Sequence, residues 1–166
     1  MLAVPPALAT AISRPNAVRA ATHPLVALPI WLATYFLWHL PPAYDSALRH
    51  RDSLLHAEHA SYVFAGCLLW WPVVHDRPWS LPPQRRAFYL VAAFVLVSPL
   101  GLLLTLLPSP AYDFYDGFRR WHVSALDDQR AAGVLMTAAE AVVFFVAFSY
   151  WFLRFLSRED DVPRGR

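Results

Sequence analysis

The tetrapeptide HAEH, residues 56–59, places two imidazoles and a carboxylate at the start of a long apolar run. Residues three apart on a helix project from the same face, so His56 and His59 can point toward a common centre. Glu58 is turned by about 200° from His56 and by about 100° from His59, which makes it a poor third ligand. Neutral imidazoles bind transition-metal ions well. The spacing therefore predicts a metal-binding pair whose remaining ligands come from other helices.

Further histidine and carboxylate side chains lie next to other apolar runs. His39 closes an earlier run within "WHLPPAYD", and Asp127 and Asp128 come shortly before the last run. We expect His39, His56 and His59 to form a metal site together with one of the two aspartates. As an alternative, each histidine at the end of an apolar run can anchor in the headgroup zone or bond a backbone carbonyl.

Two more polar residues are candidates for the same region or for a second one. His122, in "RRWHVSALDDQ", is expected to be a loop residue near the site. Glu140 interrupts the last apolar run about 15 Å along the helix, where an unpaired carboxylate is costly and is a functional candidate by default. The alternative for Glu140 is a neutral side chain that joins two helices through a hydroxyl of Ser98, Thr105 or Thr137.

The elements that would position these residues are long and apolar. Apolar residues make up 57% of the 166 residues and charged residues 16%, a composition too apolar for an ordinary soluble domain. A hydrocarbon core of roughly 30 Å requires about 20 mostly apolar helical residues. Four runs approach this length, at 24–40, 54–74, 87–107 and 131–153. The sequence therefore predicts an all-α polytopic membrane protein, a bundle of four transmembrane helices, and not a soluble helical bundle.

The chain divides into three expected regions. Residues 1–22 form a leader, disordered or interfacial, because the segment lacks the basic start of a secretory signal. Residues 23–155 hold the four spans. Residues 156–166 form a solvated, charged tail.

The 14 basic residues are all arginines, and their distribution predicts the orientation. Nine lie in the two tails and the second loop, and five lie in the first and third loops. Cytoplasmic segments carry the excess of basic residues, so we expect both termini to be cytoplasmic. The first and third loops then face the outside of a bacterial plasma membrane. The expected partner is the lipid bilayer and not a nucleic acid. Formation of a homo-oligomer is a further possibility that the sequence leaves open.

Three stretches resemble a known family. They are "HPLVALPIWLATYFLWHLPPAYDSALRH", "LHAEHASYVFAGCLLWWPVV" and "LDDQRAAGVLM", and in this order they resemble the CtaG-type cytochrome c oxidase assembly factors of bacteria over residues 23–153. The resemblance implies a multi-pass plasma-membrane protein that helps to mature the haem-copper oxidase by handling copper on the outer face. It places His39, His56, His59 and Asp128 at the family's polar site, with Gln129 orienting a ligand.

Two features depart from the pattern of that family. Its members usually have additional N-terminal spans, so this chain resembles their C-terminal part. The stretch after Met136 reads "TAAEAV", where the family tends to have proline and glycine, and Glu140 is therefore peculiar to this sequence.

The expected function is that of a copper-binding or copper-delivering assembly factor, and not of an enzyme. Its partner would be a haem-copper oxidase subunit or another copper-handling protein. Cu(I) often binds thiolate or thioether groups. Because we do not expect Cys67 or Met136 at the outer rim, the site would be rich in histidine, and zinc would also fit it.

Three other functions stay open from the residues alone. A zinc-dependent membrane hydrolase would use Glu58 or an aspartate as its base, although the sequence lacks an HExxH motif. A haem-binding electron carrier would ligate iron through histidines on facing helices. A purely structural helper would dock on another membrane protein through Phe144, Phe145 and Phe148.

Overall fold

The computed structural model describes residues 5–12, 15–115 and 123–160. Within them the regular elements are all helical, which confirms the expected all-α class for the described chain. The expected leader, 1–22, contains two short helices. The elements in chain order are α1 (Pro6–Ile12), α2 (Asn16–Ala21), α3 (Pro24–His39), α4 (Pro41–Arg49), α5 (Leu54–Val74), α6 (Pro83–Leu106), the 3₁₀ helix η1 (Asp113–Tyr115) and α7 (Ala125–Asp160).

Prolines mark where several of these helices begin. Pro24, Pro41 and Pro83 each occupy the first helical position, where the missing backbone N–H costs nothing and the fixed φ favours a helix. The pair at 41–42 also ends α3, because a residue before proline is pushed out of the helical region. The chain therefore turns by 70° between α3 and α4. This turn places His39 at a corner between two helices.

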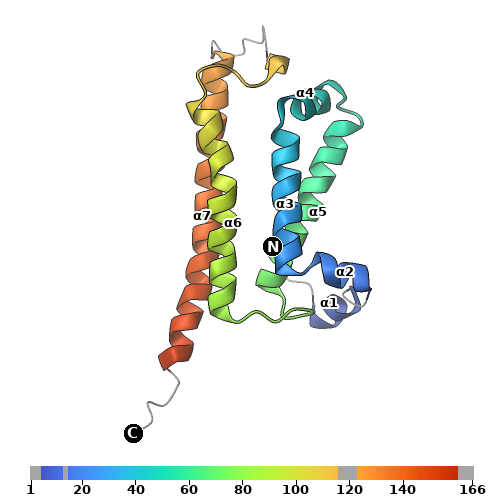
Figure 1. The fold of residues 1–166 in the computed structure, drawn as a ribbon, viewed down its shortest axis with the longest axis vertical. Coiled ribbons are helices and arrows are strands. Elements are labelled where there is room, and N and C mark those ends of the chain that lie inside the picture. The colour runs from blue at the N-terminus through green and yellow to red at the C-terminus, as the bar shows by residue number, and fades with distance from the viewer. Residues whose placement is uncertain (1–4, 13–14, 116–122, 161–166) are drawn as a thin grey trace.

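The long helices form two antiparallel pairs, α3 with α5 and α6 with α7 (Figure 1). One end of the molecule, which we call the loop end, holds α4, η1 and the start of α7. The opposite end, which we call the tail end, holds α1, α2, the α5–α6 connection and the last turns of α7. The first and third loops therefore lie together, as the topology predicted from the sequence requires.

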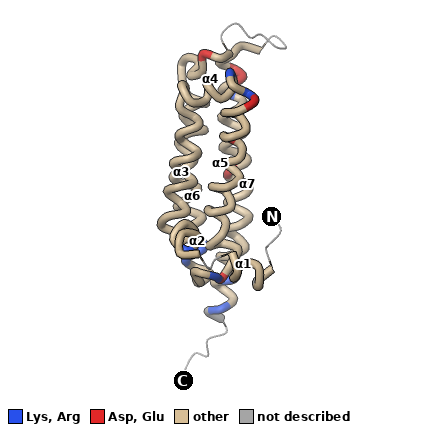
Figure 2. Tube along the Cα trace, turned by 90° about the vertical axis from the view of Figure 1, so that its right-hand side faces the viewer, with Lys and Arg blue, Asp and Glu red and all other residues tan. Residues whose placement is uncertain are grey.

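Two helices of the described chain are long and apolar enough to cross a membrane by themselves: α6, and α7 over Ala125–Arg158. The bent pair α3 and α4 meets the same criteria as one broken span. Helix α5 has 21 residues and coincides with the expected run 54–74, but His56, Glu58 and His59 lower its mean hydropathy. By length and apolar composition, the described chain thus has two helices that could cross a membrane, or three spans if the bent pair counts as one, where four were expected. Charged residues gather at the two ends of the molecule (Figure 2).

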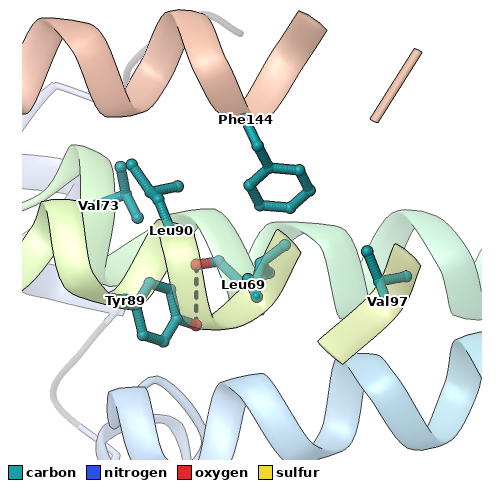
Figure 3. Packing of buried hydrophobic residues seen from close by; sticks show 7 residues of the cluster. Leu69, Val73, Tyr89, Leu90, Val97 and Phe144 are labelled. Atoms are coloured by element: carbon teal, nitrogen blue, oxygen red, sulfur yellow. Dashed lines mark hydrogen bonds between the residues drawn. The ribbon is translucent and has the colours of Figure 1, made fainter. Parts of the chain in front are cut away.

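One of two buried apolar clusters in the described chain joins both helix pairs. Leu69 and Val73 of α5, Leu90 and Val97 of α6, and Phe144 of α7 are buried against one another (Figure 3). Helix α3 covers the same cluster with partly buried side chains. The hydroxyl of Tyr89 donates a hydrogen bond of 3.2 Å to the carbonyl oxygen of Leu69, which satisfies a polar group inside this core.

Helices α6 and α7 approach most closely where each carries a glycine followed four residues later by a threonine. A Cβ atom on Gly133 would lie 2.7 Å from the carbonyl oxygen of Gly101 and 2.6 Å from Oγ1 of Thr105. Both threonine hydroxyls bond carbonyls on their own helices, Thr105 to Gly101 and Thr137 to Gly133. Small residues at this spacing let helix backbones pack closely in a membrane. This crossing holds the start of α7 against the end of α6.

The tail end is held by Arg86, whose side chain is almost fully buried. It pairs with Asp76, and it donates hydrogen bonds to the carbonyl oxygens of Val73 (3.0 Å) and Leu81 (2.9 Å). Its guanidinium lies 4.2 Å from the ring centroid of Trp151. One side chain therefore connects the end of α5, the start of α6 and the last part of α7.

Candidate functional site

The HAEH segment faces the opposite way from our expectation. Glu58 is only 8% exposed and belongs to the inner stripe of α5 that continues through Ala65 and Leu69, whereas His56 and His59 are exposed. The packing of α5 selects this face, because the bulkier apolar residues further along the helix must point inward. The predicted convergence of His56 and His59 with His39 is therefore wrong.

His56 and His59 instead bond backbone carbonyls close to them in the chain. Nδ1 of His56 lies 3.0 Å from the carbonyl oxygen of Arg51, and Nδ1 of His59 lies 2.6 Å from that of Leu55. These contacts correspond to the alternative role, in which each histidine is a polar anchor where the apolar helix begins.

His39 has a different environment, half-buried between helices at the corner after α3. Its Nδ1 lies 2.7 Å from the carbonyl oxygen of Tyr35, so Nδ1 is the protonated nitrogen and Nε2 carries the lone pair. The hydroxyl of Tyr62 on α5 lies 3.4 Å from the same nitrogen, and the hydroxyl of Tyr112 donates to the backbone oxygen of His39 (3.2 Å). The imidazole is thus fixed in orientation, and within the described residues its Nε2 has no hydrogen-bond partner.

His39 lines a cavity of about 120 Å³ at the loop end. Two of the other expected site residues, Asp128 and Gln129, line the same cavity. Met136 also lines it, so a thioether faces the same cavity as the imidazole of His39. The remaining lining residues are tyrosines or apolar residues: Tyr44, Leu104, Pro110, Tyr112, Tyr115, Ala125 and Ala132.

A group of tyrosines forms the wall of this cavity. The rings of Tyr44 and Tyr112 stack with their centroids 4.1 Å apart, and the hydroxyls of Tyr44 and Tyr115 lie 3.1 Å apart. Glu58 lies near enough to Tyr44 and Tyr62 to interact with them electrostatically. Burial, with smaller effects from Asp45 and Tyr115, raises the pKa of Tyr112 to about 12, so its hydroxyl stays a donor.

The segment that carries Tyr112 and Tyr115 is held by a buried carboxylate. The two oxygens of Asp45 on α4 accept hydrogen bonds from the backbone N–H groups of Asp113 and Phe114, each 3.2 Å long. A carboxylate at the first residues of η1 satisfies backbone donors that have no partner within a helix. Asp45 therefore fixes the wall of the cavity without lining it.

The residues before and within the first turn of α7 differ in role from our expectation. Asp127 accepts a hydrogen bond from the hydroxyl of Ser124 (2.6 Å) and donates one through its backbone to that hydroxyl (3.1 Å), which caps the helix. Gln129 bonds the backbone of Ala111 (2.6 Å) and of Leu104 (3.0 Å), so it closes the cavity. Its amide oxygen accepts the first of these bonds and its amide nitrogen donates the second. His122 lies outside the described residues.

Among the described residues, no three His, Cys, Asp or Glu side chains lie close enough to hold a metal ion. The expected histidine-rich site, and the three-ligand site that a zinc hydrolase needs, are therefore absent from this part of the chain. The cavity brings together a different set: one imidazole from His39, one thioether from Met136 and one carboxylate from Asp128. Imidazole and thioether groups are ligands that Cu(I) accepts.

Glu140 lies on the side of α7 that faces α3. Its Oε1 accepts a hydrogen bond from the hydroxyl of Tyr35, and its Oε2 is buried without a hydrogen-bond partner among the described residues. The hydroxyls of Ser98, Thr105 and Thr137, expected as partners, bond carbonyls on their own helices instead. A serine or threonine hydroxyl within a helix can bond a carbonyl oxygen of the preceding turn. The hydrogen-bond partner of Glu140 therefore comes from the facing helix α3.

Sequence reasoning missed the tyrosines, although a signal for two of them was present. The tetrapeptide PAYD occurs twice, at 42–45 and at 110–113, and the structure stacks its two tyrosines, Tyr44 and Tyr112, on each other. The aspartate of the first copy, Asp45, holds the backbone of Asp113 in the second copy. The two loops of the loop end are therefore joined through matching sequence segments.

The fold and the site together define a class: an all-helical protein with apolar helices and a small tyrosine-walled polar cavity at one end. A family model described as cytochrome c oxidase caa3 assembly factor (Caa3_CtaG) matches residues 1–158. The chain belongs to this family, which confirms the resemblance seen in its sequence and, with the apolar helices, indicates a membrane protein. No curated protein matches the chain, and neither does any solved structure.

Proposed function

We propose that the chain acts in the assembly of a haem-copper cytochrome c oxidase and that the cavity at the loop end is its working site. The observation that supports this most directly is that His39 of α3 and Asp128 and Met136 of α7 line one cavity in a member of the caa3 assembly-factor family. A concave site with a few convergent polar groups is typical of ligand binding.

The arrangement we propose is four spans in a bacterial plasma membrane, with both termini in the cytoplasm. Helices α3, α5, α6 and α7 contribute to one core, and the excess of arginine favours the tail end as the cytoplasmic one. The exposed His56 and His59 then lie at the level of the lipid headgroups. In this arrangement the cavity lies near the outer surface of the membrane.

The cargo we propose is Cu(I), bound transiently as a substrate of transfer. Nε2 of His39 is free because Nδ1 is engaged by Tyr35, and Met136 supplies a soft sulfur ligand. Asp128, which is exposed at the cavity, can approach from the aqueous side. A set of one imidazole, one thioether and one carboxylate that is open to the aqueous side holds copper less tightly than a closed site. Such binding suits delivery to an oxidase subunit or to another copper-handling protein.

Complementation tests this function directly. A host that lacks the gene is supplied with wild type, with His39→Ala/Met136→Leu, or with the control His56→Ala/His59→Ala, and cytochrome c oxidase activity is measured in isolated membranes. We expect the wild type and the control to restore activity and the cavity variant to lose most of it at equal protein level. Full activity of the cavity variant overturns the proposal.

A further inference from the structure

Glu140 is a half-buried residue that the copper cavity does not use. It lies near the middle of the apolar part of α7, roughly 22 Å from Ala125 and roughly 27 Å from Arg158 along the helix axis. One of its oxygens is bound by Tyr35, and the other, Oε2, is buried with no hydrogen-bond partner in the described part of the chain. An ionised carboxylate in this position is costly unless it is paired.

The titratable groups around Glu140 supply no fixed positive charge. Helix α3 presents Tyr35, with His39 one turn further on. Helix α5 contributes Tyr62 and, nearer the loop end, Glu58, while Tyr112 comes from the loop before η1. Helix α6 has no charged side chain after Arg86.

The arginines also lie too far away to compensate Glu140. The ion pair of the described residues, between Arg86 and Asp76, is at the tail end and does not involve Glu140. Uptake of a proton is therefore the available way to neutralise this carboxylate.

The surroundings of Glu140 differ between its two sides. Toward the loop end, the ring of Tyr35 lies 4.8 Å from the ring of His39 and 6.2 Å from that of Tyr62, measured between centroids. His39 in turn lines the cavity with Asp128. Polar and titratable groups thus continue from Glu140 to the cavity.

Toward the tail end, the path is apolar. Phe144, one turn after Glu140, packs with Leu69, Leu90 and Val97 in the central core (Figure 3). Among the buried residues of that cluster the ionisable side chain is that of Tyr89, which is already engaged with the carbonyl of Leu69. The cavity of about 410 Å³ that Leu90 and Phe144 line is walled by apolar side chains. Such a space does not hold ordered water, and its walls offer no hydrogen-bonded relay.

From these two environments we propose that Glu140 is a proton-binding site within the membrane that exchanges its proton with the loop end of the molecule and not with the tail end. The proton enters from the aqueous phase through the cavity, passes along the side chains near Tyr35, and binds Oε2. No oxidation or reduction accompanies this step, and its only effect is to remove one negative charge from the carboxyl.

A hydrophobic carbodiimide tests the proposal, because it adds to protonated carboxyl groups in apolar surroundings. Wild-type protein is reconstituted in sealed phospholipid vesicles with dicyclohexylcarbodiimide, and the label is located by peptide mass spectrometry. Only molecules whose C-terminal tail is protected from protease are counted, so that the loop end faces the bulk solution. The pH of the bulk and of the lumen is then varied separately.

We expect the label on the peptide that contains Glu140, and we expect its amount to fall ~tenfold per pH unit once the bulk pH exceeds the titration point of the group. Changes in luminal pH should leave it unaltered. Glu140→Gln should abolish the label, while Glu58→Gln, which alters the other buried glutamate of the apolar helices, should keep it. Peptide mapping of the wild type decides the location even if Glu140→Gln does not fold.

Two results would overturn the inference. One is an unlabelled Glu140 peptide in the wild type at every pH, which would mean that the carboxyl does not hold a proton. The other is a label that follows luminal pH, which would place proton access at the tail end. Both results leave the copper proposal intact, because oxidase activity and copper content are measured independently.

Discussion

The hydroxyl of Tyr35 on α3 donates a hydrogen bond to Oε1 of Glu140 on α7, and this contact joins the two helix pairs in the apolar part of the molecule. An aromatic contact between the same helices lies beside it, with Trp31 6.0 Å from Phe144 between ring centroids. A polar contact surrounded by apolar groups is sensitive to the loss of either partner, because the group that remains is left unsatisfied.

Tyr35→Phe removes the donor and leaves both oxygens of Glu140 unpaired. We expect the free energy of unfolding in detergent to fall by about 1–3 kcal/mol. Glu140→Leu added to Tyr35→Phe should recover part of this loss, because no polar group then remains buried. Thermal unfolding of the two single variants and the double variant measures the coupling, and strictly additive effects would show that the contact carries no energy.

Gly133→Ala places a methyl group against the backbone of α6, where the carbonyl oxygen of Gly101 would be 2.7 Å away. We expect a loss of about 1–3 kcal/mol in stability, because the two helices must separate. Gly66→Ala is the matched control, since a Cβ there meets nothing within 4 Å. That control should be neutral or stabilising by up to about 1 kcal/mol, and an equal loss in both variants would contradict a close crossing.

Arg86→Gln removes the side chain that joins three helices at the tail end. The carbonyl oxygens of Val73 and Leu81 lose their donors, so we expect a destabilisation of about 1–3 kcal/mol. The neighbouring Arg85 is exposed, and Arg85→Gln should change stability by less than about 0.5 kcal/mol. Denaturation of both variants in the same detergent compares them. Similar effects of the two substitutions would show that the contacts of Arg86 are not stabilising.

Tyr112 should make stability depend on alkaline pH. Its pKa in the folded protein is about 12, above the ordinary value of 10.0, so folding favours the protonated hydroxyl. This contribution is fully present below about pH 10 and is lost as the pH rises through about 12. The stability of the wild type relative to Tyr112→Phe should therefore decline over that interval. A difference that stays constant with pH would contradict the burial of this hydroxyl.

The fold was predictable to the extent that apolar periodicity and length determine it. The runs at 24–40 and 54–74 end within one residue of α3 and α5, because prolines and polar residues bound them. The run at 131–153 was too short, since α7 continues through charged residues at both of its ends. Amphipathic residues at a helix end extend a helix without lengthening its apolar run.

The site was predictable only in part. The sequence named His39, Asp128 and Gln129, which line the cavity, but it did not show which side chains of HAEH point toward the protein interior. The spacing of His56 and His59 shows that they share a face and does not show which face α5 buries. That choice depends on residues further along the helix, where Ala65 and Leu69 point inward together with Glu58.

Contacts between distant segments were beyond single-sequence reasoning. Tyr44 and Tyr112 are far apart in the chain, and only the tetrapeptide that they share indicated a contact between them. Met136 was not among the expected site residues, although it lines the cavity together with His39. In the structure the cavity extends down to this residue between α7 and the loop before η1.

Copper retention tests the central claim most directly. Purified protein is loaded with Cu(I) under a reductant, challenged with a Cu(I) chelator, and its copper and zinc contents are measured by mass spectrometry. We predict that wild type and His56→Ala/His59→Ala retain similar copper, and that His39→Ala/Met136→Leu loses it at least ~tenfold, which corresponds to about 1.4 kcal/mol of binding free energy. Two results would contradict the account. One is that His56→Ala/His59→Ala loses copper while His39→Ala/Met136→Leu keeps it, and the other is that no sample retains copper.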